Sequence, residues 1–269
     1  MKDRNYIRRP VLRAINFLAI WMFGIISISL ILYHTSSTVL YEVSAAIYTF
    51  ILCYVFCNFL DRKSLLDLGL RLRKAEVINL FLGIFIGAFM ITTVLLIEWG
   101  LKLVYVEVNS NIDLSYQMYG ILTFFLVAFT EETVFRGYFL QRLLLSLDEK
   151  YAILLSSVTF SILHFFNPNV NFLGFLVIST MGVLLGLCYL KTRSLYLPIG
   201  LHFAWNYFEG FVYGFPVSGR EIEGLLLTKV KGPAWLTGGA FGPEGSFIGL
   251  IIALLVSLTM FFYLRLKER

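Results

Sequence analysis

Long apolar runs constrain this chain more than any other feature of its sequence. A helix needs ~20 apolar residues to cross the hydrocarbon core of a bilayer. By that criterion the sequence predicts roughly eight spans, over residues 14–33, 38–60, 77–101, 117–140, 151–166, 172–190, 195–213 and 247–264. Only 14% of the residues are charged, against about 25% in soluble domains. We therefore predict an all-α polytopic membrane protein, with residues 1–269 as one transmembrane domain surrounded by lipid.

The basic residues predict how these spans are oriented. If the spans alternate in direction, eighteen of the 22 Lys and Arg residues fall on the side of both termini. The other side carries four, namely Lys102, Arg220, Lys229 and Lys231. Cytoplasmic connections of membrane proteins are enriched in Lys and Arg. We therefore expect both termini to be cytoplasmic, and the net charge of +5 does not indicate a nucleic-acid partner.

The segment TEETVFRG, residues 130–137, places ionisable groups directly after an almost wholly apolar run. An ionisable side chain costs about 2.5–3.5 kcal/mol in a membrane span on insertion scales, so such a residue is a functional hypothesis by default. Glu132 and Arg136 are four residues apart, so they can form an ion pair on one helix face. Glu131 points about 100° away from that pair and stays available for chemistry. The alternative is a charged helix end near the lipid headgroups.

Two of the three histidines, His164 and His202, lie inside apolar helices, and Asn206 shares a helix face with His202. A lone histidine in such a helix is usually a satisfied core residue. Several polar groups on separate helices all need buried partners, however, so we expect them to gather with the glutamates around one cavity. His164 fits least well, since it lies ~20 Å from the basic end of its helix, whereas Glu131 and His202 lie ~12 Å from theirs.

Two chemistries fit such a cavity. In the first, Glu131, His164 and His202 bind zinc or another divalent metal, with an open position for water. In the second, which needs no metal, Glu131 is helped by His164 and takes a proton from water. His202 and Asn206 then donate hydrogen bonds to the developing oxyanion. Both chemistries hydrolyse a carbonyl compound, and a peptide bond is the expected substrate.

The motifs EETVFRG, FSILH and HFAWN, in that order, resemble those of the CPBP intramembrane protease family. That family includes the CAAX prenyl endopeptidases and many bacterial proteins linked to bacteriocin processing or immunity. The resemblance covers residues 119–213, and residues 117–213 would be the catalytic core helices. It implies a bundle of about eight membrane helices, with a cavity open to the cytoplasm. By position it implies a catalytic Glu131, support from Glu132 and Arg136, and a polar centre completed by His164, His202 and Asn206.

We therefore expect an intramembrane endopeptidase of the bacterial plasma membrane that cuts a membrane-associated or lipidated peptide. Family members are usually described as metalloproteases, and a metal-free, glutamate-dependent mechanism is the alternative. Two other classes stay open, an ion-coupled transporter and a non-enzymatic bacteriocin-immunity or scaffold protein. A transporter would be expected to have broken helices in two symmetric halves, and the sequence has no such internal symmetry. The connection over residues 210–245 is predicted to be a plain flexible loop rather than a lid.

Overall fold

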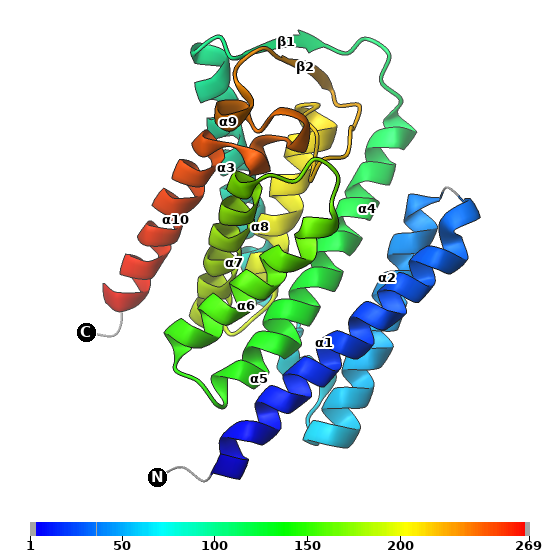
Figure 1. The fold of residues 1–269 in the computed structure, drawn as a ribbon, viewed down its shortest axis with the longest axis vertical. Coiled ribbons are helices and arrows are strands. Elements are labelled where there is room, and N and C mark those ends of the chain that lie inside the picture. The colour runs from blue at the N-terminus through cyan, green and yellow to red at the C-terminus, as the bar shows by residue number, and fades with distance from the viewer. Residues whose placement is uncertain (1–3, 36, 267–269) are drawn as a thin grey trace.

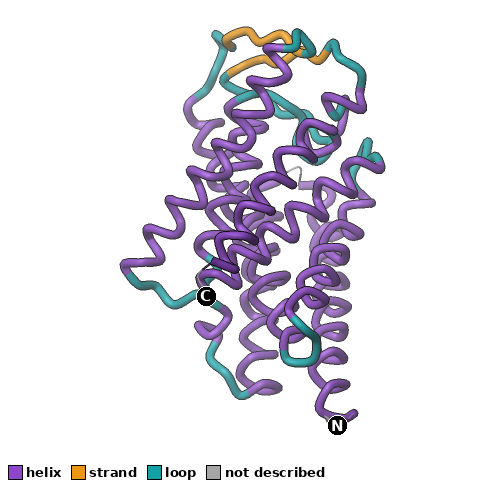
Figure 2. The backbone as a smooth tube through the Cα atoms, turned by 90° about the vertical axis from the view of Figure 1, so that its left-hand side faces the viewer, coloured by secondary structure: helices purple, strands orange, loops and turns teal. Residues whose placement is uncertain are grey.

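The computed structural model describes residues 4–35 and 37–266, and most of them are helical (Figures 1 and 2). The long helices are α1 (Arg4–Leu32), α2 (Thr38–Val55), α3 (Lys74–Gly100), α4 (Leu114–Glu132), α6 (Glu149–Leu163), α7 (Phe172–Thr192), α8 (Tyr196–Tyr207) and α10 (Phe247–Leu266). The start of α1 and the end of α10 lie toward the same end of the bundle (Figure 1). That agrees with alternating spans. Three basic residues used to predict the orientation, Lys2, Lys267 and Arg269, lie outside the described residues.

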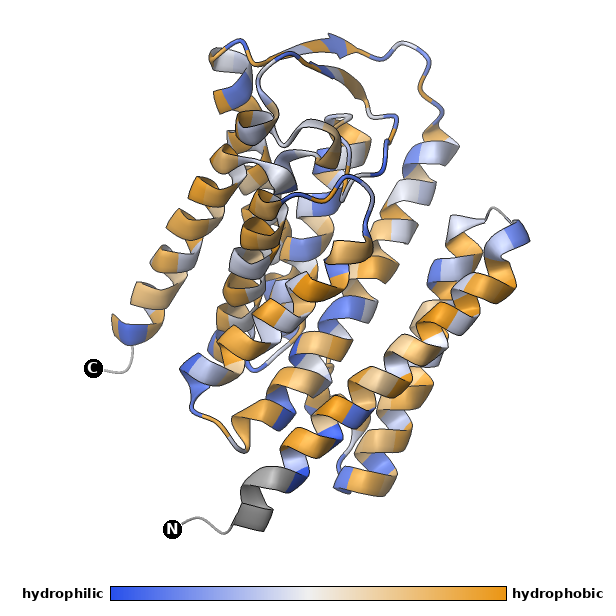
Figure 3. Ribbon diagram, viewed as in Figure 1, coloured by the Kyte–Doolittle hydropathy of each residue, from blue (hydrophilic) through white to orange (hydrophobic). Residues whose placement is uncertain are grey.

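Six helical stretches within the described residues are long and apolar enough to cross a membrane. They are Arg9–Thr35, Thr38–Asp61, Lys74–Gly100, Leu114–Leu144, Phe172–Thr192 and Phe247–Leu266. The prediction of an all-α polytopic membrane protein is confirmed, and apolar residues dominate these helices (Figure 3). The two remaining predicted spans correspond to α6 and α8, which have 15 and 12 residues. Most of α8 is buried, so protein rather than lipid surrounds it.

Helices α3 and α8 pack with their backbones close together. Small residues permit such an approach between membrane helices. A Cβ atom on Gly87 of α3 would collide with the Leu201 carbonyl, and a Cβ atom on Gly200 of α8 would collide with the Leu80 carbonyl. These glycines therefore fix α8, with its polar residues, against α3.

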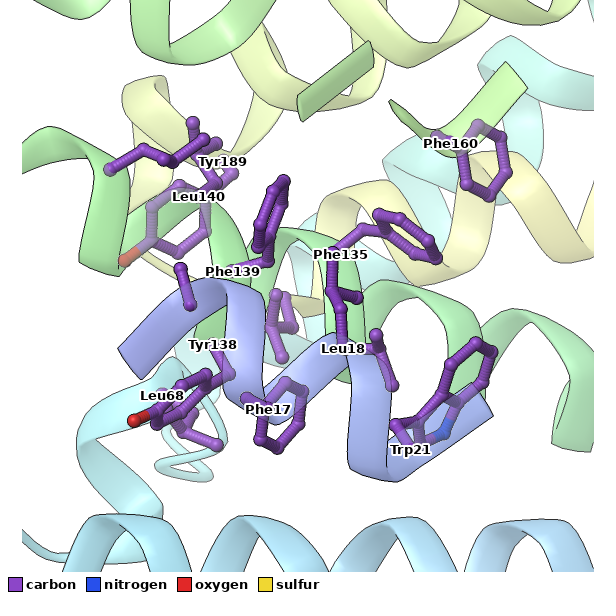
Figure 4. Packing of buried hydrophobic residues seen from close by; sticks show 14 of the residues in the cluster. Phe17, Leu18, Trp21, Leu68, Phe135, Tyr138, Phe139, Leu140, Phe160 and Tyr189 are labelled. Atoms are coloured by element: carbon purple, nitrogen blue, oxygen red, sulfur yellow. The ribbon is translucent and has the colours of Figure 1, made fainter. Parts of the chain in front are cut away.

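A π-helical segment, Thr133–Phe139, continues α4 directly after Glu132 and leads into the short helix α5 (Leu140–Leu144). All of its residues are buried. Its aromatic side chains pack against α1 (Figure 4), and the ring of Tyr138 stacks on Phe17 with centroids 4.2 Å apart. Because π-helical turns are rare and frequently occur at functional sites, the segment marks the region that follows the glutamate pair.

The connection after α8 is folded, so the prediction of a plain flexible loop is wrong. Its strand β2 (Leu226–Val230) pairs antiparallel with β1 (Val104–Val108), and a short helix, α9 (Ala234–Thr237), follows. We call residues 213–246 the cap, because they lie across the end of the bundle away from the termini (Figure 1). The sequence did not reveal this pairing because the two strands are far apart in the chain.

Candidate active site

Glu132 is the centre of a buried ionic network. Its Oε1 accepts one hydrogen bond from Arg136 Nη1 at 2.7 Å and another from His202 Nδ1 at 2.9 Å. The predicted ion pair between Glu132 and Arg136 is therefore confirmed. Arg136 also donates through Nη2 to the Gly182 carbonyl of α7 at 3.2 Å, and its guanidinium lies 4.6 Å from the centre of the Phe160 ring. The network thus ties the end of α4 to α6, α7 and α8.

The Glu132 contact also decides which nitrogen of His202 carries a hydrogen. A carboxylate paired with Arg136 is ionised and can only accept hydrogen bonds. Nδ1 of His202 must therefore be the donor, which in the neutral ring leaves Nε2 as the acceptor. Nε2 lies 3.8 Å from Glu131 Oε2. Glu132 thus orients His202 toward Glu131, a role that the sequence analysis did not assign to it.

Glu131 is less constrained by its neighbours than Glu132. Its side chain is 24% exposed, whereas that of Glu132 is fully buried. Its Oε2 has no hydrogen-bond partner, since 3.8 Å to His202 is too long for a hydrogen bond. As predicted, Glu131 takes no part in the ion pair of Glu132 with Arg136.

A cavity of about 570 Å³ brings the predicted polar residues together. Glu131, His164, His202 and Asn206 all line it, so their predicted gathering around one cavity is confirmed. Several polar atoms in this region are buried without a hydrogen-bond partner, namely Oε2 of Glu131, Oε2 of Glu132, Oδ1 of Asn206 and the hydroxyls of Thr130 and Thr133. Buried polar atoms cost free energy unless something bonds to them. Their concentration here indicates a region built to receive a polar ligand.

His164 shares the cavity but not the ionic network. It lies where α6 ends, and its Nδ1 is 2.8 Å from the Phe160 carbonyl. Nδ1 therefore donates to that carbonyl, and Nε2 of the neutral ring keeps its lone pair. Among the described residues His164 forms no hydrogen bond or ion pair with Glu131 or His202. The sequence had also placed His164 at a different depth from Glu131 and His202, at ~20 Å against ~12 Å from the basic ends of their helices.

The described residues do not contain three His, Cys, Asp or Glu side chains arranged to hold a metal ion. The predicted ligands Glu131, His164 and His202 therefore do not form a three-ligand site in this arrangement, because His164 stands apart from the other two. A zinc ion or another divalent metal bound by these residues stays a prediction. The geometry does not favour it.

The cavity lies on the side of the cap. Val217, Ser218 and Arg220 of the cap line it, whereas no lining residue comes from the connections 62–73, 145–148 and 193–195 at the end of the termini. The lining residues therefore place the cavity toward the cap, and an opening to the cytoplasm stays a prediction. The sequence could not show how far the cavity lies from either end of the bundle, because an apolar run predicts a helix but not the tilt of the helices around it.

Glu42 is a cavity residue that the sequence analysis missed. It belongs to α2, is 8% exposed and lines the cavity with Glu131. The signal was present, because Glu42 is an acid within the predicted span 38–60 and meets the criterion that singled out Glu131. Unlike Glu131, Glu42 lies in no motif that would have drawn attention to it.

Residues 114–208 match the family model described as type II CAAX prenyl endopeptidase Rce1-like. This segment contains all of the predicted site residues, and the resemblance inferred from the three motifs is confirmed. The match joins the site to a protease family. Searches of the curated proteins and of the solved structures found no match to the chain.

Proposed function

We propose, from the Rce1-like match of residues 114–208, that this protein is an intramembrane endopeptidase that hydrolyses a peptide bond of a membrane-associated or lipidated peptide. The observation that carries the proposal is the Glu131 carboxylate. It lines a membrane-embedded cavity without a partner for Oε2, and it lies 3.8 Å from His202 Nε2. A free carboxylate beside an oriented imidazole is the arrangement that general acid–base catalysis requires.

Glu131 acts as the base in this proposal. It takes a proton from a water molecule, and the resulting hydroxide attacks the carbonyl carbon of the scissile bond. Nε2 of His164 holds a lone pair toward the same cavity and can accept the second hydrogen of that water, which orients the water for attack. The unpartnered oxygen atoms of Glu131 and Thr130 support this role, because a bound water needs several polar partners.

His202 and Asn206 stabilise the tetrahedral intermediate. The ionised Glu132 favours a positive charge on His202, whose Nε2–H can then donate to the oxyanion together with the Asn206 amide. Preorganised donors of this kind contribute several kcal/mol, since removing one from an oxyanion hole costs about 10²- to 10³-fold in kcat. The proton held on Glu131 is finally transferred to the leaving amine, so the peptide bond breaks and the site returns to its starting state.

The experiment is cleavage of a membrane peptide by the purified full-length protein and by Glu131→Gln. We expect the rate to fall by about 10²- to 10⁴-fold, the range that general acid–base groups contribute. The substitution keeps the size of the side chain, so thermal unfolding in detergent should be unchanged. The matched control is Glu149→Gln, which changes an exposed glutamate paired with Arg193. Undiminished cleavage by Glu131→Gln would refute the proposal.

A further inference from the structure

Glu42 is a second carboxylate in the cavity, and the proposed mechanism does not use it. It lies one turn inside α2 and is 8% exposed. Among the described residues it forms no hydrogen bond and no ion pair. An acid buried in a membrane span is costly without a partner. Its presence therefore needs an explanation.

The Glu42 carboxylate faces the cavity. Other buried acids of this protein, Glu98 and Glu209, have both carboxylate oxygens sealed inside the bundle without a partner. Glu42 is not in that situation, since its oxygens reach the cavity surface that it lines. Glu42 also lines the same cavity as Glu131. A group bound to Glu42 would therefore share that cavity with the reacting bond.

The charges around the cavity are unbalanced. Three carboxylates line it, and Glu244 is already bonded by the Ser218 backbone N–H at 3.0 Å and by the Ser218 hydroxyl at 2.6 Å. The one guanidinium among the described lining residues is that of Arg220, which is exposed and attracts Glu42 without forming an ion pair with it. Glu42 is thus left with no cation in contact, whereas Glu131 has His202 Nε2 at 3.8 Å.

We propose that Glu42 binds a lysine or arginine side chain of the substrate, close to the bond that Glu131 cleaves. This inference rests on the proposed function and adds a substrate class to it. A buried carboxylate rejects a neutral or acidic side chain, because it would stay unpaired or be repelled. A long basic side chain can reach it while its methylene groups lie along the apolar wall. The cavity volume of about 570 Å³ is within the range of pockets that hold peptide-sized ligands.

The test uses internally quenched apolar peptides of equal length, each with Lys, Gln or Glu at one variable position along the chain. Purified full-length protein in lipid vesicles cleaves them, and kcat/KM is compared between wild type, Glu42→Gln and Glu42→Lys. We expect wild type to prefer Lys over Gln by ~10- to 100-fold at one position, the range of a hydrogen bond to a charged group. Glu42→Gln should lose that preference, and Glu42→Lys should prefer Glu.

Two further variants test whether the preference for Lys depends on Glu42 and not on charged residues elsewhere. Arg220→Gln removes the competing cation and should increase the preference for Lys. Glu107→Gln is the matched control, because Glu107 is an exposed residue of β1 that pairs with Lys229 outside the cavity, and it should leave the preference unchanged. Binding of the peptides to the inactive Glu131→Gln variant measures recognition without cleavage, and the Lys peptide should again bind more tightly.

The outcomes are distinguishable. Cleavage that depends on Glu131 but shows equal rates for Lys, Gln and Glu peptides would overturn the Glu42 proposal and leave the proposed function standing. A Lys preference that survives in Glu42→Gln would overturn it as well. Cleavage that does not depend on Glu131 would refute the proposed function, and the Glu42 proposal would fall with it.

Discussion

The described residues include two buried charge clusters, which differ in how completely their carboxylate oxygens are satisfied. The site cluster consists of Glu131, Glu132, Arg136 and His202. The anchor cluster is centred on Asp61, whose side chain is 1% exposed. Its Oδ1 accepts a hydrogen bond from Arg13 at 2.6 Å and forms an ion pair with Arg142 Nη1 at 3.1 Å, and its Oδ2 accepts from the Tyr138 hydroxyl at 2.8 Å. The anchor cluster ties α1 and α5 to the end of the second span.

The difference separates structural charge from functional charge. Both oxygens of Asp61 have partners, and the one unpartnered atom of this cluster, Nε of Arg142, does not line the cavity. The site cluster leaves Oε2 of Glu131 and Oε2 of Glu132 without partners beside a cavity. Satisfied polar networks stabilise one structure, whereas unsatisfied groups that border a cavity can bind a ligand there. Burial and charge alone would not have distinguished the two clusters.

The largest effect is expected from Arg136→Met. This change leaves the Glu132 carboxylate buried with no ion-pair partner except His202, and breaking a buried pair costs about 3–5 kcal/mol. We expect that loss in the free energy of unfolding, measured by denaturation in detergent. Peptide cleavage should also fall, because His202 loses the carboxylate geometry that orients it. A free energy of unfolding close to that of the wild type would show that the ion pair of Arg136 with Glu132 stabilises the protein no more than an exposed ion pair does.

Arg142→Met is the matched change in the anchor cluster, and its effect should be smaller. Asp61 keeps Arg13 and Tyr138 when the ion pair with Arg142 is removed, so we expect the loss to stay below the about 3–5 kcal/mol of a buried pair that is broken completely. Cleavage per folded molecule should stay at the wild-type rate. If cleavage fell as far as in Glu131→Gln, the separation of the two clusters into functional and structural would be wrong.

Gly87→Ala should disturb the site cluster through packing alone. The new methyl group would meet the Leu201 carbonyl, and overpacking of this kind costs about 1–3 kcal/mol. Because Leu201 precedes His202, we expect slower cleavage as well as lower stability. Gly100→Ala is the control, since a Cβ atom there has no neighbour within 4 Å. Equal behaviour of the two variants would show that close packing does not position His202.

The smallest effect is expected at the exposed pair of Asp67 and Arg71, which are 2.6 Å apart in the connection between α2 and α3. The hydrogen bond from Arg71 holds the pKa of Asp67 below its ordinary value. Its contribution to stability is therefore present above the unfolded pKa of about 3.9 and is lost as the pH falls through the lower folded value. We expect Asp67→Asn to lower the thermal unfolding temperature slightly at pH 7 and by less at pH 3, where part of the contribution is lost. A large change in the thermal unfolding temperature at pH 7 would show that this exposed pair contributes as much to stability as the buried clusters do.

Local signals made part of the site predictable. Glu132 and Arg136 are four residues apart on one helix, so their ion pair is encoded in the spacing. The gathering of His164, His202 and Asn206 followed from the cost of polar groups in apolar helices, and the helical fold followed from the length of the apolar runs. The same reasoning could not show that Glu132 also bonds to His202, because that contact joins residues 70 positions apart.

Contacts between distant segments were beyond the sequence. Asp61 lies 48 positions from Arg13 and 77 from Tyr138, and no spacing rule relates them. The cap escaped prediction for the same reason, since β1 and β2 belong to different connections of the bundle. The depth of each polar side chain in the bundle could not be predicted either, because tertiary packing sets the tilt of the helices. The sequence therefore could not show that His164 lines the cavity without joining the ionic network.

The glycine contacts between α3 and α8 have a mechanical consequence. The backbones there already touch, so α8 cannot move toward α3 to make room for a passing polypeptide. Room for such a chain has to come from the other helices around the chamber, among them α1 and α2, which line it with Trp21, Ile25 and Tyr41. The contact with α3 is thus a fixed support that keeps the imidazole of His202 in place.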